Sequence, residues 1–209
     1  MSEAVLDRLE RVRIVPVVVI DDAAGAGDLA EALAAGGIRC AEITLRTQAG
    51  LAALEAAATV PDFTVGAGTV LTADQVDRCA DAGAQFIVSP GFDEDVVNRA
   101  RERGLVALPG IATATELQRA LRAGLEAVKF FPADRLGGLP GIASLAAPFP
   151  TVRFMPSGGV SAANAAEYLA HPAVFAVGGS WMVPRAAVAA GDFAAIERLS
   201  AEAMALVAR

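Results

Sequence analysis

The chain has 209 residues, of which 55% are hydrophobic and 20% are charged, so it can bury a large core and is not intrinsically disordered. Its 17 basic and 24 acidic side chains give a net charge of −7, which disfavours nucleic acid as a partner but still allows a small anion. The amphipathic N-terminal segment and the short apolar stretch over 14–20 suit neither a signal peptide nor a membrane span, so we expect a cytoplasmic protein.

Short β-branched runs alternate with longer alanine-rich segments of helical period along the chain. The apolar runs predict strands over 13–20, 40–46, 63–70, 85–90, 105–110, 127–132, 153–159 and 174–181. Helices are expected near 28–36, 48–59, 73–82, 93–103, 114–123, 139–146, 162–170 and 192–208. No low-complexity linker divides the pattern, so we expect a single domain over 1–209.

Strict alternation of strand and helix is typical of a parallel sheet covered by helices. Because the pattern holds eight such units, the predicted fold class is α/β, a (β/α)8 TIM barrel with an extra N-terminal helix. The alternative is an open doubly wound sheet. The segment after the first strand, IDDAAGAGD, lacks the third glycine of the dinucleotide-binding pattern, so the barrel is favoured.

Scarce residue types exclude several kinds of site. A single histidine, His171, and two cysteines, Cys40 and Cys79, cannot supply a histidine-based triad, a histidine cluster or a paired-cysteine zinc site, so no metal is expected. Two isolated cysteines fit a reducing compartment, and we expect both to be small core or helix residues.

Polar residues inside the predicted strands stand out, because strands of a parallel barrel are apolar on both faces. In the second strand, Glu42, Thr44 and Arg46 share one face, which points into the barrel. Buried charges are costly unless they are paired or used. The two charged side chains are therefore candidates for a site, although a buried ion pair that only fills the barrel remains an alternative.

The sixth predicted strand carries Lys129, the only lysine beside 16 arginines. Arginine stays protonated, whereas a desolvated lysine can release its proton and act as a nucleophile. Lys129 and Glu42 near the ends of strands two and six are the parts of a Schiff-base site, in which a carboxylate moves protons beside a covalently bound ketone. Arg46 suits a substrate carboxylate, and Thr69 adds a hydroxyl donor. A Lys129–Glu42 pair that serves packing alone is the alternative.

Two glycine pairs follow the last two predicted strands, Gly158-Gly159 and Gly178-Gly179. Glycine lets backbone amides approach an anion, and the loops after strands seven and eight of a barrel are a frequent phosphate site. We therefore expect a phosphorylated substrate.

The motifs EITLRT, GAGTVL, FFPA and GGSW, together with VPVVVI near the N-terminus, occur in the order and spacing of one family over nearly the whole chain. The chain resembles the KDPG/KHG aldolases, which are class I 2-keto-3-deoxy-6-phosphogluconate and 4-hydroxy-2-oxoglutarate aldolases. The resemblance implies cleavage of 2-dehydro-3-deoxy-6-phosphogluconate to pyruvate and glyceraldehyde 3-phosphate, and of 4-hydroxy-2-oxoglutarate to pyruvate and glyoxylate. It also implies no cofactor and a homotrimer.

Residue roles follow from the same resemblance. They are the Schiff-base lysine and general acid/base at Lys129 and Glu42, the pyruvoyl pocket at Arg46, Thr69 and Pro90, the phosphate contacts at Gly158, Gly159 and Ser180, and specificity at Ser157 and Phe131. Ser157 stands where members usually carry threonine, which leaves the C4-epimeric galactonate aldolase as an alternative. A non-covalent sugar-phosphate epimerase or isomerase, and a non-catalytic sugar-phosphate sensor, are the other hypotheses.

Overall fold

A computed structural model describes the backbone from Ser2 to Val207 and the side chains from Ala4 onward. Its strands are β1 (Ile14–Val18), β2 (Cys40–Thr44), β3 (Thr64–Gly68), β4 (Phe86–Ser89), β5 (Val106–Ile111), β6 (Ala127–Phe130), β7 (Arg153–Pro156) and β8 (Val177–Gly179). Its α-helices are α1 (Ser2–Val12), α2 (Ala26–Ala35), α3 (Gly50–Ala58), α4 (Ala73–Asp81), α5 (Glu94–Glu102), α6 (Ala114–Arg122), α7 (Gly138–Ala146), α8 (Ala165–Leu169), α9 (Arg185–Ala190) and α10 (Phe193–Val207). Two 3-10 turns, η1 (Ala23–Gly25) and η2 (Ala133–Leu136), complete the described elements.

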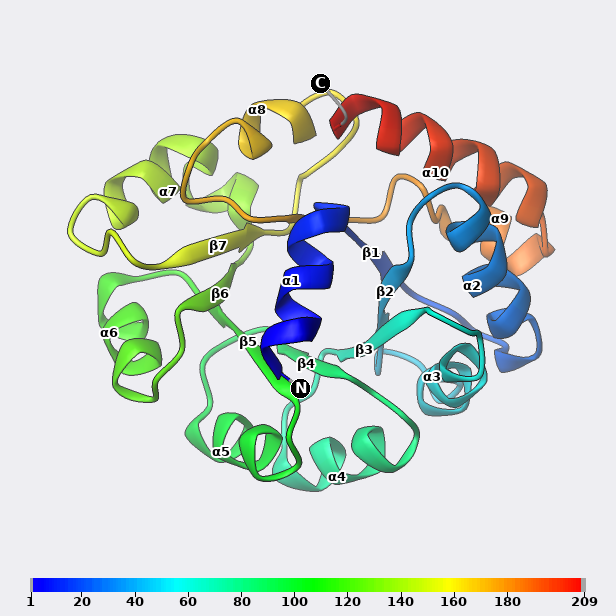
Figure 1. Cartoon of the computed structure of the whole chain (residues 1–209), viewed down its shortest axis with the longest axis horizontal. Helices are drawn as coiled ribbons and strands as arrows, with labels where there is room; N and C mark the ends of the chain where they lie inside the picture. Colours follow the sequence, from blue (N-terminus) through cyan, green and yellow to red (C-terminus); the bar gives the residue numbers. More distant parts are fainter. Residues whose placement is uncertain (1, 208–209) are drawn as a thin grey trace.

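The strands form one parallel ring in sequence order, from β1 to β7, with β8 paired to β1 (Figure 1). The bridges Phe154–Val174 and Ser157–Gly178 join the β7 and β8 segments and bring the ring to closure. Sequential order around a ring is the (β/α)8 arrangement, so the predicted barrel is confirmed and the open doubly wound sheet is wrong.

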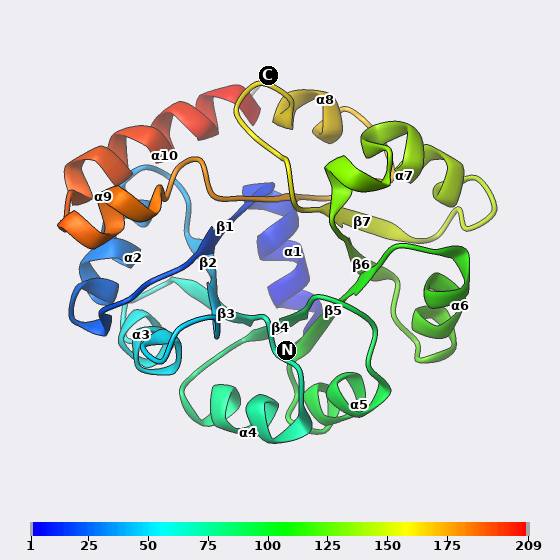
Figure 2. The ribbon, with the colours of Figure 1, turned by 180° about the vertical axis from the view of Figure 1, so that it is seen from behind.

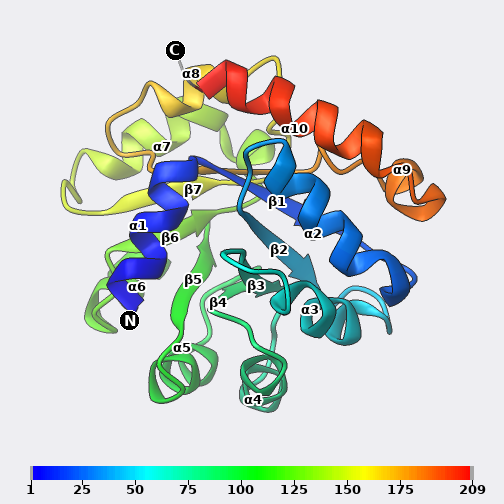
Figure 3. The same ribbon diagram turned by 45° about the vertical axis from the view of Figure 1, so that its right-hand side comes forward.

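Strand residues are buried on both faces, because the inner face fills the barrel and the outer face meets the helices. Helices α2 to α10 form an outer layer around the ring, and the long α10 runs beside α2 (Figure 3). Within residues 2–207, none of the helices combines the length and the apolar character that a bilayer crossing requires.

Helix α1 lies across one end of the ring, in front in Figure 1 and behind in Figure 2. Its apolar residues Val5 and Leu9 are buried. Glu10 accepts a 2.8 Å bond from Arg153 at the start of β7, so α1 closes the end where the strands begin. The active sites of such barrels lie at the opposite end, where the strands finish.

The element boundaries differ from prediction in two respects. Most observed strands end one or more residues before the predicted ends, so Arg46 and Thr69 lie just beyond β2 and β3. Helix α9 was not predicted, because its six residues are too few to show a helical period.

Candidate active site

The two charged side chains predicted inside the barrel meet at its centre. Lys129 on β6 and Glu42 on β2 are separated by 3.3 Å between Nζ and Oε1. Glu42 is completely buried and Lys129 is 3% exposed. Since removing two charges from water is costly and this contact is a single hydrogen bond, the pair is a poor device for stability alone. This geometry favours a chemical use of the pair over mere packing.

Glu42 keeps one oxygen without a partner. Its Oε2 is buried, and no described residue donates a hydrogen bond to it. Native proteins rarely leave a buried polar atom unsatisfied, and an exception inside a barrel points to a bound water or substrate group. Oε1 contacts the amine, while Oε2 is available to accept a proton.

Gly68 at the end of β3 makes room for this carboxyl group. A Cβ atom at that position would lie 2.5 Å from Glu42 Cγ and 2.7 Å from Cδ, which is well inside contact distance. Gly68 has no role among the sequence predictions, although it lies in the GAGTVL motif. Its function becomes visible only when β2 and β3 are paired in register, with Thr44 beside Gly68.

Thr44 shares the inward face with Glu42, as the strand period predicted, but its hydroxyl is already used. It is fully buried, and Oγ1 donates a 2.8 Å hydrogen bond to the Val18 carbonyl at the end of β1. Thr44 therefore fixes β2 to β1 beside the charged pair.

Arg46 and Thr69 come together at the rim. Arg46 Nε donates a 3.3 Å bond to Thr69 Oγ1, and no carboxylate of a described residue lies within ion-pair distance of the guanidinium. Thr69 has a φ of +60°, a strained conformation for a residue with a Cβ, and such strain is concentrated at functional sites. The free guanidinium and the hydroxyl can together bind a carboxylate.

Phe131 and Pro90 lie at the end of the barrel opposite α1. Phe131 directly follows β6, and its ring centroid is 5.0 Å from Lys129 Nζ, so the aromatic face covers one side of the amine. Pro90 directly follows β4 and is exposed. Both predicted residues thus lie at the ends of barrel strands, on the same side of the ring as Arg46 and Thr69.

The loop after β7 presents free backbone donors. The carbonyl oxygens of Ser157, Gly158 and Gly159 accept bonds from Ala133 N, Asp134 N and Asn164 Nδ2, at 2.9, 3.1 and 3.0 Å. In contrast, no described residue accepts a hydrogen bond from the N–H groups of Gly158 and Gly159. Both glycines have positive φ, +88° and +78°. Successive free N–H groups in a turn form a concave anion site.

The second glycine pair adjoins this loop. Gly178 on β8 pairs with Ser157, and a Cβ at Gly178 would lie 3.0 Å from Ser157 Oγ. Ser180 follows β8 directly and is exposed. The structure therefore brings Ser157, Ser180 and the Gly158–Gly159 turn to one part of the rim.

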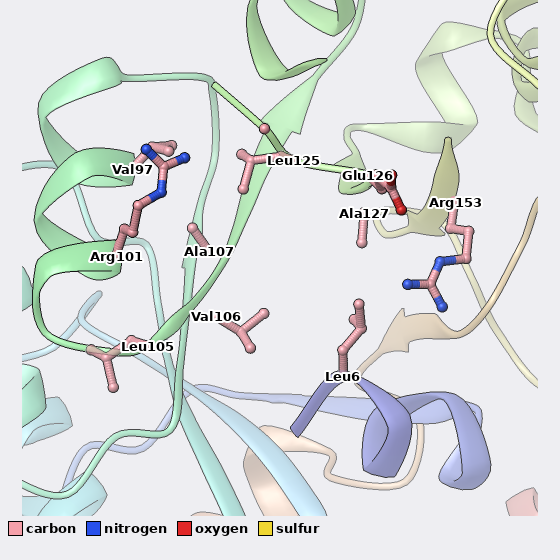
Figure 4. Close-up of a pocket in the computed structure, with 11 residues that line it drawn as sticks. Leu6, Val97, Arg101, Leu105, Val106, Ala107, Leu125, Glu126, Ala127 and Arg153 are labelled. Carbon is pink, nitrogen blue, oxygen red and sulfur yellow. The ribbon is translucent and has the colours of Figure 1, made fainter. Parts of the chain in front are cut away.

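A separate hollow of about 360 Å³ lies at the other end of the barrel (Figure 4). It is bordered by Leu6 of α1, by the starts of β5 and β6, and by Arg101 and Arg153. None of the predicted site residues lines it, and this end of a barrel serves stability rather than chemistry. Within the described residues, no three histidine, cysteine, aspartate or glutamate side chains gather as a metal site would require.

Comparison with known proteins assigns the family. The family model described as KDPG and KHG aldolase matches residues 5–199, a range that includes every candidate site residue from Glu42 to Ser180. The chain belongs to the KDPG and KHG aldolase family. The resemblance inferred from the motifs is thereby confirmed.

Several members of this aldolase family are similar over nearly their whole length. A 2-dehydro-3-deoxy-phosphogluconate aldolase of Treponema pallidum is 49% identical over 207 residues, covering 97% of each chain. The crystal structure of the 2-keto-3-deoxy-6-phosphogluconate aldolase of Zymomonas mobilis ZM4 with 3-phosphoglycerate has a TM-score of 0.90 and 43% identity, covering 96% of this chain and 95% of that one. The KDPG aldolase of Legionella pneumophila, with pyruvate captured at low pH as a covalent carbinolamine intermediate, has a TM-score of 0.89 and 40% identity, covering 95% of each.

Proposed function

We propose that this chain is a class I aldolase that cleaves 2-dehydro-3-deoxy-6-phosphogluconate to pyruvate and glyceraldehyde 3-phosphate. The observation that carries the proposal is the buried Lys129 amine, 3.3 Å from a glutamate whose second oxygen has no partner. The name of the Treponema pallidum relative and the covalent pyruvate of the Legionella pneumophila structure support the same chemistry.

The reaction begins when Lys129 transfers a proton to Glu42 and its neutral nitrogen attacks the C2 ketone of the substrate. The resulting carbinolamine loses water to give an iminium. Glu42, deprotonated again, removes the proton of the C4 hydroxyl, and the C3–C4 bond breaks as its electrons move into the iminium. Glyceraldehyde 3-phosphate leaves, the enamine is protonated at C3, and water then releases pyruvate and the free amine.

The remaining site residues hold the two charged ends of the substrate. Arg46 and Thr69 bind the C1 carboxylate beside Pro90, while the N–H groups of Gly158 and Gly159 bind the phosphate.

Three further residues complete the assignment. Ser180 adds a hydroxyl at the phosphate, Phe131 packs on the amine, and Ser157 lies between the two ends, where it influences the choice of configuration at C4. The shorter 4-hydroxy-2-oxoglutarate uses the same lysine and gives pyruvate and glyoxylate.

Borohydride trapping tests the proposal. Because the chain has one lysine, pyruvate reduced onto it must modify Lys129, and peptide mapping separates this adduct from one at the N-terminal amine. We expect no adduct and no turnover in Lys129→Ala or Lys129→Arg, since arginine cannot lose its proton. Glu42→Gln should lose turnover far more than trapping. Turnover without an adduct would instead favour a non-covalent epimerase or isomerase, and binding without pyruvate release would favour a sensor.

Kinetics on the two C4 epimers decide between the gluconate and galactonate activities. We expect higher kcat/KM on the gluconate substrate, because Ser157 keeps the hydroxyl of the threonine that members usually carry. Higher kcat/KM on the galactonate epimer would assign the alternative.

Organisation of the chain in the cell is part of the same proposal. We expect a single-domain, cytoplasmic homotrimer, as the family resemblance implies. Light scattering should then give about three times the chain mass of 21.2 kDa, and cell fractionation should recover the activity without detergent. A monomer mass would overturn the trimer.

A further inference from the structure

The η2 turn, which follows β6, runs alongside the loop after β7 that is predicted to bind phosphate. Ala133 N and Asp134 N donate to the carbonyl oxygens of Ser157 and Gly158, at 2.9 and 3.1 Å. These two bonds fix the start of η2 against the loop. The side chains of η2 therefore lie at the same rim as the free N–H groups of Gly158 and Gly159.

Asp134 places a negative charge next to this anion site. A Cβ at Gly159 would lie 2.7 Å from Asp134 Cγ and 3.0 Å from Oδ2, so the carboxylate packs directly on the glycine. Burial raises the pKa of the Tyr168 phenol, and the Asp134 charge adds to that rise. A phosphate group carries nearly two negative charges at neutral pH, so Asp134 alone would repel it.

Arg135 supplies the opposing charge. Its Nε lies 3.4 Å from Asp134 Oδ2, and this is the one ion pair that Asp134 makes among the described residues. The Arg135 side chain is 82% exposed and the Asp134 side chain 42% exposed. Such exposed pairs are weak, so the guanidinium can change partners at little cost. A phosphate dianion offers it a stronger, bidentate partner than one carboxylate does.

We infer that Arg135 is a phosphate-binding residue of the substrate site, and that its guanidinium turns from Asp134 to the substrate phosphate held on Gly158 and Gly159. This inference rests on the proposed function. Asp134 holds the arginine at the rim of the site and competes with the phosphate for it. The ligand class is a phosphate monoester at the end of the substrate that is distal to its keto acid. An unphosphorylated substrate gains no binding energy from Arg135.

Two aldol reactions that share the same pyruvate chemistry test the inference. Pyruvate is condensed with glyceraldehyde 3-phosphate or with glyceraldehyde, and kcat/KM is measured for each aldehyde. In Arg135→Gln, the ratio of kcat/KM for glyceraldehyde 3-phosphate to kcat/KM for glyceraldehyde should fall about 5- to 10-fold, mainly through a higher KM for the phosphorylated aldehyde. The difference between this variant and the unmodified protein should shrink at high ionic strength. Inorganic phosphate should also inhibit this variant more weakly.

Arg198→Gln is the matched control, because Arg198 is also an exposed arginine in an ion pair, with Glu202 on α10, and its loss changes the net charge equally. Asp134→Asn should shift the ratio in the opposite direction, since it frees Arg135 and removes a repelling charge. An unchanged ratio in Arg135→Gln, or an equal fall in Arg198→Gln, would overturn the inference. Failure of the aldolase proposal can be distinguished from failure of this inference, because the unmodified protein would then form no borohydride-trapped adduct with pyruvate.

Discussion

Replacing Gly68 by alanine should disturb the site without changing any residue to which a chemical role is assigned. The new methyl would lie 2.5 Å from Glu42 Cγ and 2.7 Å from Cδ, in a completely buried part of the barrel. Because non-bonded carbon atoms settle about 3.5–4.0 Å apart, the carboxyl group must move by about 1 Å. Overpacking of this kind lowers the free energy of unfolding by about 1–3 kcal/mol.

The larger effect should be on turnover. Displacing a catalytic group by about 1 Å can cost about 100-fold in rate, so we expect kcat for pyruvate release to fall by about this factor. Lys129 is unchanged, so borohydride should still trap pyruvate on it after long incubation. Pyruvate release is followed with lactate dehydrogenase, and stability is followed by urea unfolding.

Gly27→Ala is the matched control, because no atom lies within 4 Å of a Cβ at that helical position. It should leave kcat unchanged and should not lower stability. If Gly68→Ala keeps the kcat of the unmodified protein, or if Gly27→Ala loses as much, then the close packing of Gly68 on Glu42 does not position the carboxylate.

Three further predictions concern stability and thiol chemistry. Thr44→Val removes the hydrogen bond to Val18 O and should lower the free energy of unfolding by about 1–2 kcal/mol in urea titrations; an unchanged midpoint would mean that the bond contributes nothing. Hydrogen bonds from Arg99, and to a lesser extent from Arg103, hold the pKa of Asp77 below its usual range. The ionised Asp77 therefore stabilises the fold above about pH 4, the usual pKa of an unfolded aspartate, and this stabilisation is lost as pH falls through the lowered pKa. Asp77→Asn should therefore lower the urea midpoint at pH 7 and match the unmodified protein at strongly acidic pH, and a constant difference across pH would contradict this. Burial raises the pKa of the Cys40 thiol to about 12, so an aromatic disulfide reagent at pH 8 should label it only after unfolding, and rapid labelling of the native protein would show that the thiol is accessible.

The arrangement of strands and helices could be predicted from the sequence because it depends on hydrophobic periodicity within short segments. Alternating apolar runs and helical segments determine where strands and helices lie, and strict alternation leaves few parallel topologies. The lone Lys129 and the charged face of the second strand predicted the candidate reacting pair for an equally local reason. Charged residues in a strand buried on both faces are out of place unless they are used.

The contacts between distant strands could not be predicted in the same way. Lys129 and Glu42 are 87 positions apart, and only closure of the ring brings Nζ to 3.3 Å from Oε1. The unpartnered Oε2 is likewise a property of the assembled interior.

The amino-acid sequence by itself determined the repeating strand–helix order, the family and the identity of the candidate reactive residues. The tertiary structure alone decided that Gly68 makes room for Glu42, that Thr69 takes a strained φ beside Arg46, and that the η2 turn lies on the loop after β7. The physical reason is the sequence separation of the interacting residues. Periodicity and residue type reflect interactions among a few neighbours along the chain. Room for a carboxylate and the partner of an arginine depend instead on atoms that only the closed barrel brings together.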